Sequence, residues 1–539
     1  MTSRPVRLLL TTIALTCAFV APAVAQDDDF TFDEGASAEM SSEQEELAAY
    51  LEEGQALYKN KRYPEASNLF YKIIISEDPG ADALRQQAEY ELGKTLFLMG
   101  LYQGALDYFG RVVDVGESHP YFKPTLRGLV LLTDVIPSDP TLLLRLAAYK
   151  DSFPADVPKK YRAQFAYLVG RELYSNGLFD DAIGLLDAIP SKDARFLKAR
   201  YIMGVSHAAL YDAEGALDSF RQVLRVLVSR EEEEGELTPV ERDQLELTYI
   251  GMARVFYSAG RGNYAKALKY YDKVPRTSPN WPKALFEASW VHFQLNDLSK
   301  ALGNIHSLNA PFFSDSYFPE APILAGVIFF YNCKYARVRY ELEEFEYSYL
   351  PLMDEIDAIL SEYRDNDAGL VDWLEQLKAG EVEANERLLR ILTAALDDKV
   401  LRRKIQLFEA IGKEKKTLEA MPGSWVSGDL GQEMAGSNDL ALSLSRDGAG
   451  DLVRTRLTSV KKQIVDLNVN RERILFEVAR AEKGEIDTDM AAEMEVSSNV
   501  TEAERVEVTD EELYWTFDGE YWKDELGYYS FDVNTECKR

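Results

Sequence analysis

The chain has 539 residues and 46% of them are hydrophobic, which is enough for several domains or an elongated repeat array and excludes a wholly disordered protein. Its formal net charge is −31. This charge repels phosphate backbones and anionic lipid headgroups, so we expect no nucleic-acid partner and no direct lipid binding. The negative charge could serve to bind a partner with a basic surface, or it could serve only to keep the protein soluble.

The first residues have the pattern of a secretory signal peptide. Two arginines precede an apolar run over residues 8–20, and a small-x-small site places cleavage between Ala25 and Gln26. An uncleaved anchor and lipidation of Cys17 are alternative interpretations. We expect residues 1–25 to be removed and the chain to be exported, with the periplasm as its compartment and outer-membrane association left open.

Internal repeats are the clearest signal in the sequence. A small residue is followed nine positions later by an aromatic or apolar residue, then by alanine three positions on and a large apolar residue four further on. Looser copies begin at Gly251, Ser289 and Gly326. The four clean copies are Gly54, Tyr63, Ala66, Phe70; Gly93, Tyr102, Ala105, Phe109; Gly170, Phe179, Ala182, Leu186; and Gly204, Ala213, Ala216, Phe220.

These residue types suit a stack of helix pairs, because a small residue permits a close helix crossing and a large one fills the core between repeats. The third and fourth copies begin at Gly170 and Gly204, a step that matches the period of the tetratricopeptide repeat (TPR). Over residues 43–350 the chain resembles the TPR family, in particular its exported members in bacterial envelopes. The resemblance implies a right-handed α-solenoid with a concave, protein-binding groove.

The remaining segments differ in composition. Residues 26–42 form an acidic leader, and residues 484–512 an acidic linker. We expect residues 351–483 to form a coiled-coil-like helical hairpin with a glycine-rich loop at 421–451. It could pack on itself, on the repeats or on a second chain. The seam of its second helix is apolar with one charged interruption, Arg471. Its residues are Leu457, Val460, Ile464, Leu467, Arg471, Ile474 and Val478.

The C-terminal tail, residues 513–539, carries too many aromatic side chains for a solvated segment. Either the repeats of the same chain or a partner must cover them. Because Cys333 lies in the last recognisable repeat and Cys537 lies just beyond the aromatic run, we expect a disulfide between them, the alternative being two unpaired thiols. The apolar residues are Tyr514, Trp515, Phe517, Tyr521, Trp522, Leu526, Tyr528, Tyr529 and Phe531.

No catalytic or ligand-binding motif stands out. None of the four histidines has a second histidine at metal-ligand spacing, and phosphate-loop and nucleophile-elbow motifs are absent. The sequence therefore predicts no enzyme activity, cofactor or metal. It predicts an all-α interaction scaffold that binds other envelope proteins. The alternative is a structural subunit of a larger envelope machine, in outer-membrane assembly, division, secretion or gliding motility. A third hypothesis, an active site on the hairpin and tail, requires convergent polar groups in a pocket.

Overall fold

The computed structural model is all-α in the part of the chain that it describes, which contains no strand. The expected signal peptide, its cleavage site at Ala25 and Gln26, residues 26–40 of the expected leader and residues 493–512 of the expected linker lie outside that part. Residues 484–492, which we expected to begin the linker, are helical. The described residues are 41–136, 139–149, 159–313, 316–382, 386–396, 399–492, 517, 519–531 and 533–537.

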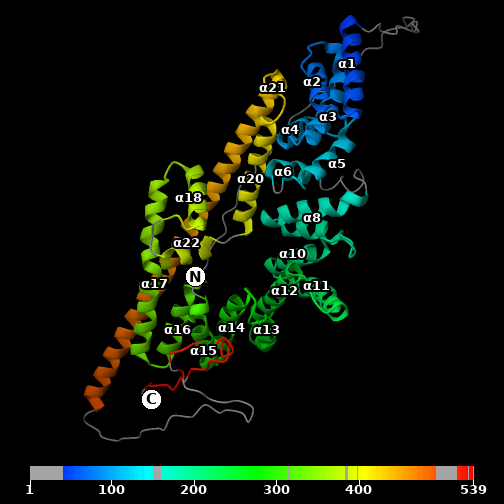
Figure 1. The fold of residues 1–539 in the computed structure, drawn as a ribbon. Helices are drawn as coiled ribbons and strands as arrows, with labels where there is room; N and C mark the ends of the chain where they lie inside the picture. Colours follow the sequence, from blue (N-terminus) through cyan, green and yellow to red (C-terminus); the bar gives the residue numbers. More distant parts are fainter. Residues whose placement is uncertain are drawn as a thin grey trace, which may run out of the picture.

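Successive helices in the first half are joined by short turns and stack into a solenoid of the expected TPR type (Figure 1). The described residues between 116 and 164, which carry no clean repeat, include α5, α6 and the start of α8. The bounds are α1 Ser42–Lys59, α2 Tyr63–Ile74, η1 Pro79–Ala81, α3 Asp82–Met99, α4 Tyr102–Val115, α5 Phe122–Leu132, α6 Pro140–Ala148, α8 Lys159–Ser175, α9 Phe179–Asp187, α10 Phe196–Ala209, α11 Ala213–Glu234, α12 Pro239–Ser258, η2 Arg261–Asn263 and α13 Tyr264–Tyr271.

Each clean repeat is closed by the same contact between its two helices. The repeat glycine lies under the large apolar residue of the second helix: a Cβ on Gly54 would come within 2.7 Å of the Phe70 ring, and one on Gly204 within 2.6 Å of the Phe220 ring. A larger side chain would therefore push the pair apart. The four repeat alanines are fully buried at 0% exposure: Ala66, Ala105, Ala182 and Ala216.

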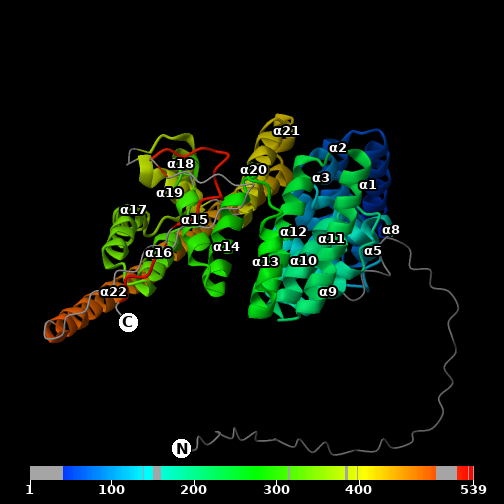
Figure 2. The same ribbon diagram turned by 90° about the horizontal axis from the view of Figure 1, so that it is seen from below.

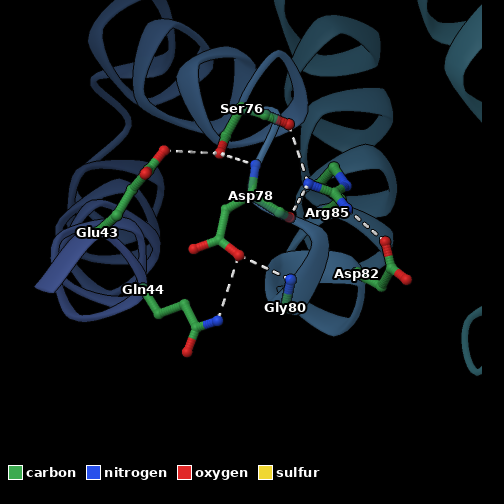
Figure 3. Close-up of polar contacts among 7 residues, drawn as sticks. All are labelled: Glu43, Gln44, Ser76, Asp78, Gly80, Asp82 and Arg85. Carbon is green, nitrogen blue, oxygen red and sulfur yellow. Dashed lines mark hydrogen bonds and ion pairs between the residues drawn. The ribbon is translucent and has the colours of Figure 1, made fainter. Parts of the chain in front are cut away.

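A polar joint connects the first repeat to the second (Figure 3). The Asp78 carboxylate accepts the backbone N–H of Gly80 at 2.7 Å and the side-chain amide of Gln44 at 3.3 Å. Arg85 donates to the backbone carbonyl groups of Ser76, at 2.9 Å, and Asp78, at 2.6 Å. The Gly80 hydrogen bond is the main reason that the pKa of Asp78 is lowered. These bonds fix the turn between α2 and α3.

The second half continues the solenoid and then reverses direction. The expected boundary at residues 350 and 351 falls inside α17, a single helix that contains Pro351. The part of the expected hairpin between α17 and residue 421 is divided among three helices, α18, α19 and α20. The bounds are α14 Trp281–Leu295, α15 Leu298–Leu308, η3 Pro311–Phe313, α16 Glu320–Tyr331, α17 Tyr335–Glu362, α18 Asp367–Ala379, α19 Glu386–Leu396, α20 Lys399–Glu419, α21 Gly423–Val426 and α22 Asp429–Ala492.

The prediction of a loop over residues 421–451 is wrong for most of its length, because α22 begins at Asp429. Two of the glycines that suggested a loop lie where another backbone passes close to the helix. A Cβ on Gly431 would lie 2.2 Å from the Trp425 carbonyl oxygen, and one on Gly450 would lie 1.8 Å from the Asp367 carbonyl oxygen. These glycines therefore serve close packing, which has the same residue preference as a loop.

Helix α22 links the two ends of the solenoid (Figures 1 and 2). Near its start it contacts α4, α20 and α21, and farther along it contacts α18, α17 and α16. The expected hairpin therefore exists between α20 and α22, and α22 packs in addition on α18 and on the repeat helices α4, α16 and α17. We call α20–α22 the strut.

Candidate protein-interaction face

The repeat residues singled out in the sequence are structural. Their side chains lie between helices, as the fully buried Ala66, Ala182 and Phe70 illustrate. The aromatic residues at the turns are half-buried: Tyr63 and Tyr102 pack against the core from its edge. These positions therefore build the solenoid.

Each turn aromatic contacts a second aromatic ring that the sequence analysis missed. The rings of Tyr58 and Tyr63 have centroids 5.7 Å apart, and those of Phe97 and Tyr102 are 5.6 Å apart. The missed ring lies four residues after the repeat glycine. In the fourth copy alanine replaces both the turn aromatic and its partner ring. The two positions therefore vary together between copies, and this pattern could have predicted the contact from the sequence. The same pairing occurs in Tyr174–Phe179, Tyr257–Tyr264 and Phe330–Tyr335.

The first helices of the repeats lie next to one another and form one layer. Helix α1 contacts α3, and farther along α8 contacts α10, which contacts α12. In three clean copies a tyrosine stands three residues before the glycine: Tyr90, Tyr167 and Tyr201. In two of these copies a cation stands one residue after the glycine, Lys94 and Arg171. Residues four apart share a helix face, so tyrosine and cation lie on the same face of α3 and of α8, and we call these five residues the tyrosine face.

The cations of the tyrosine face lie against aromatic rings. The Lys94 ammonium is 5.0 Å from the Tyr58 ring centroid and 4.8 Å from that of Tyr90, and it pairs with Glu91 at 2.7 Å. The Arg171 guanidinium is 5.9 Å from the Tyr167 centroid. Ring and cation therefore hold each other in place.

The tyrosines of this face are half-buried and anchored in the solenoid. The Tyr90 ring stacks on Tyr121 with a centroid distance of 5.0 Å, and the Tyr201 ring lies 5.6 Å from that of Phe220. Burial raises the pKa of both Tyr90 and Tyr201, so their hydroxyl groups stay neutral and able to donate hydrogen bonds. Tyrosine and arginine on a rigid support have the composition of interaction hot spots.

The strut is held to the first repeats by buried polar contacts. Trp425 is 3% exposed and donates its indole N–H to the Ser67 hydroxyl at 2.9 Å. The Glu414 carboxylate accepts the backbone N–H of Gln103, in the first turn of α4, at 2.9 Å and 3.2 Å. Glu414 thereby satisfies an N-terminal donor of a helix that is distant in the sequence. Burial is the main reason that its pKa is raised to about 7.

At the other end the strut is held by buried or half-buried arginines. Arg471, the charged interruption of the predicted seam, is 8% exposed; it donates to the Leu342 carbonyl at 3.2 Å and pairs with Glu346. Arg454 pairs with Asp367 at 2.5 Å. The apolar seam is buried against the same helices as Leu342. The strut is therefore fixed at two places far apart along the solenoid.

The C-terminal tail packs on α15, so the same chain covers the described aromatics in part. The His306 ring lies among three tail rings, with centroid distances of 4.4 Å to Phe517, 5.0 Å to Tyr521 and 4.9 Å to Tyr529. Burial, and secondarily Arg337, lowers the pKa of His306. The predicted tail residues Tyr514 and Trp515 lie outside the described part.

The end of the tail is bonded to the solenoid. Phe531 exchanges two hydrogen bonds with Ser299, at 2.7 Å and 3.2 Å. Cys537 forms the expected disulfide with Cys333, with sulfur atoms 2.04 Å apart. Lys334 pairs with Glu536 at 3.0 Å beside it. These bonds attach the end of the tail to the turn between α16 and α17.

Within the described ranges we find no group of three or more histidine, cysteine, aspartate or glutamate side chains that could hold a metal ion. None of the helices in the same ranges combines the length and apolarity needed to cross a membrane. The chemistry that the described residues do offer is recognition by rings, cations and neutral hydroxyl groups on the tyrosine face.

No protein-family model matches the chain, and the search of curated proteins finds no match. Similar solved structures include a tetratricopeptide repeat protein from Parabacteroides merdae, 13% identical over 48% of this chain and 92% of that one, with a TM-score of 0.31. The apo form of RapI is 13% identical over 67% and 98%, with a TM-score of 0.33, and yeast Tom70 is 11% identical over 85% and 100%, with 0.20. These scores carry no argument about function, so the assignment of a TPR-type fold depends on the repeat geometry of the chain itself.

Proposed function

We propose that this protein is a non-enzymatic scaffold that binds other proteins through the tyrosine face of its repeats. The observation that supports this most is the recurrence of tyrosine at equivalent positions of α3, α8 and α10, with a cation beside it on α3 and α8. The solenoid that carries these residues is held at two places by the strut. A face whose curvature is fixed in advance loses less conformational freedom on binding. The many carboxylates of the chain make a partner with basic groups beside its aromatic or apolar anchors the best fit.

We further propose that the chain is exported and that its partners are envelope proteins in the periplasm. The pattern of residues 1–25 supports this, and so does the disulfide between Cys333 and Cys537, since disulfides persist in oxidising compartments. Fractionation of cells tests the location. Recovery of the chain in the cytoplasm with residues 1–25 still attached would end this part of the proposal.

Co-purification from the native envelope after mild crosslinking tests the binding role. We expect the double substitution Tyr167→Ala, Arg171→Ala to lose the partner set that the unchanged chain captures. The matched control is Tyr211→Ala, which removes a tyrosine that is 96% exposed in the turn between α10 and α11. Equal capture by all three proteins would contradict the proposal.

A second candidate function is a structural subunit of a larger envelope assembly. One observation favours it: α22 carries large apolar side chains that are exposed, whereas its other face is buried in the fold. A stoichiometric complex of several proteins in the same co-purification would support this role over recognition of a single partner.

A further inference from the structure

The outward face of α22 carries an apolar row that the fold leaves exposed. Leu440 and Leu444 are 61% and 62% exposed, Val465 and Val469 are 37% and 52% exposed, and Phe476 is 66% exposed. On an α-helix these five positions fall within a narrow sector, on the side away from the buried seam. The row is roughly 54 Å long at the α-helical rise. We call it the outer row.

The outer row has charged residues among its apolar groups, and the net charge of these residues differs between the two halves of the helix. Asp447 and Asp451 are exposed in the N-terminal half. The C-terminal half of the row exposes Lys462, Arg473 and Arg480 and the acidic residue Glu472. An antiparallel neighbour with the same sequence would bring the acidic half of one helix to the basic half of the other. A parallel neighbour would place like charges together.

One antiparallel register satisfies the apolar and the charged positions together. When Leu440 of one copy lies opposite Val469 of the other, Leu444 lies opposite Val465 and Asp447 lies opposite Lys462. Two-fold symmetry repeats each of these pairs. Phe476 then lies opposite Glu433, which accepts a hydrogen bond from Tyr108 and pairs with Arg111 of α4. Gly436, where a Cβ would meet no atom within 4 Å, lies one turn farther along.

We propose that the outer row is a dimer interface and that its occupant is a second, antiparallel copy of this chain. The proposal does not depend on the binding role of the tyrosine face, because the outer row lies on α22 and the tyrosine face on α3, α8 and α10. The dimer would display two tyrosine faces and give the scaffold two binding sites.

Sedimentation equilibrium of residues 26–539 tests the proposal. We expect a dimer at micromolar concentration and a monomer for Leu444→Glu, which places a carboxylate in the apolar row. The matched control is Val240→Glu, at a position 65% exposed on α12, and it should leave the dimer intact. A wild-type monomer throughout the concentration range would overturn the proposal, as would a dimer that Leu444→Glu does not affect.

A charge exchange distinguishes a second copy from any other partner. Asp447→Lys alone and Lys462→Asp alone should each weaken the dimer about tenfold or more, since each places like charges together twice. The double variant should restore it, because the introduced lysine of one copy would then face the introduced aspartate of the other. Failure of the double variant to restore the dimer would overturn the proposed register.

Crosslinking provides an independent measurement. The exposed Thr455 lies beside the proposed two-fold axis, so Thr455→Cys should crosslink to itself with a short bismaleimide. Cys333 and Cys537 do not react because they are disulfide-bonded. Tyr211→Cys, far from α22 along the chain, is the control and should remain uncrosslinked. Equal crosslinking at the two positions, or none at Thr455→Cys, would contradict the interface.

Discussion

Gly448 and Gly450 lie two residues apart in α22 and meet different surroundings. A Cβ on Gly450 would lie 1.8 Å from the Asp367 carbonyl oxygen, whereas one on Gly448 would meet no atom within 4 Å. We expect Gly450→Ala to lower the free energy of unfolding by about 1–3 kcal/mol, since the backbone of α18 must move. Gly448→Ala should raise it by about 0.5–1 kcal/mol, because alanine favours a helix. Urea unfolding of both variants tests this, and equal effects would contradict the packing.

Glu414 makes the stability of the strut depend on pH. Its pKa is raised to about 7 in the fold, above its ordinary value of 4.5, so the folded protein binds the proton more tightly than the unfolded chain does. The stabilisation from this group is therefore fully present below pH 4.5 and is lost as the pH rises through 7. Between pH 6 and pH 8 the group should cost about 1 kcal/mol.

Thermal unfolding at pH 6 and pH 8 measures this dependence. Glu414→Gln keeps an acceptor for the Gln103 N–H and removes the titration, so the difference between the two pH values should shrink. Glu419→Gln, on the exposed side of the same helix, should leave the difference unchanged. The explanation fails if Glu414→Gln and Glu419→Gln behave alike.

At the scale of elements, the disulfide between Cys333 and Cys537 closes a long covalent loop. Cys333 and Cys537 are 204 positions apart, and chain-entropy models give about 5 kcal/mol for a loop of this length. We expect the double variant Cys333→Ser, Cys537→Ser to unfold at a lower urea concentration. Unreduced wild-type protein should show no titratable thiol after denaturation, and two thiols would contradict the bond.

The strut should set how far apart the ends of the solenoid lie. Trp425→Ala removes a buried ring and its hydrogen bond to Ser67, a change that costs about 3–5 kcal/mol in protein cores. We expect this end of the strut to detach and the radius of gyration in small-angle X-ray scattering to rise. Trp522→Ala, at a tail position 58% exposed, is the control. An unchanged radius in both variants would show that α22 does not hold the ends.

At the scale of the molecule, local periodicity predicted much of the fold. The small residue, alanine and large apolar residue of each copy report contacts within one helix pair, so the solenoid was readable from Gly54 to Phe220. The buried seam from Leu457 to Val478 was readable for the same reason.

The rest depends on contacts between segments far apart in the sequence. Gly450 indicated a loop, because nothing local reveals that the Asp367 carbonyl group passes beside it. The bonds of Glu414 to Gln103 and of Trp425 to Ser67 have no local signature either. The tyrosine face could be found only after the first helices had been placed in one layer, since tyrosines in the core and on the face look alike in sequence.

Site-specific photocrosslinking in the native envelope tests the central claim most directly. A photoreactive residue at position 167, on the tyrosine face, is compared with the same residue at position 211, in an exposed turn. If the protein binds its partners through the tyrosine face, discrete adducts with partner proteins should form at position 167 and none of these at position 211. Folded protein that gives no adduct at position 167, or the same adducts at both positions, would contradict a scaffold that binds through this face.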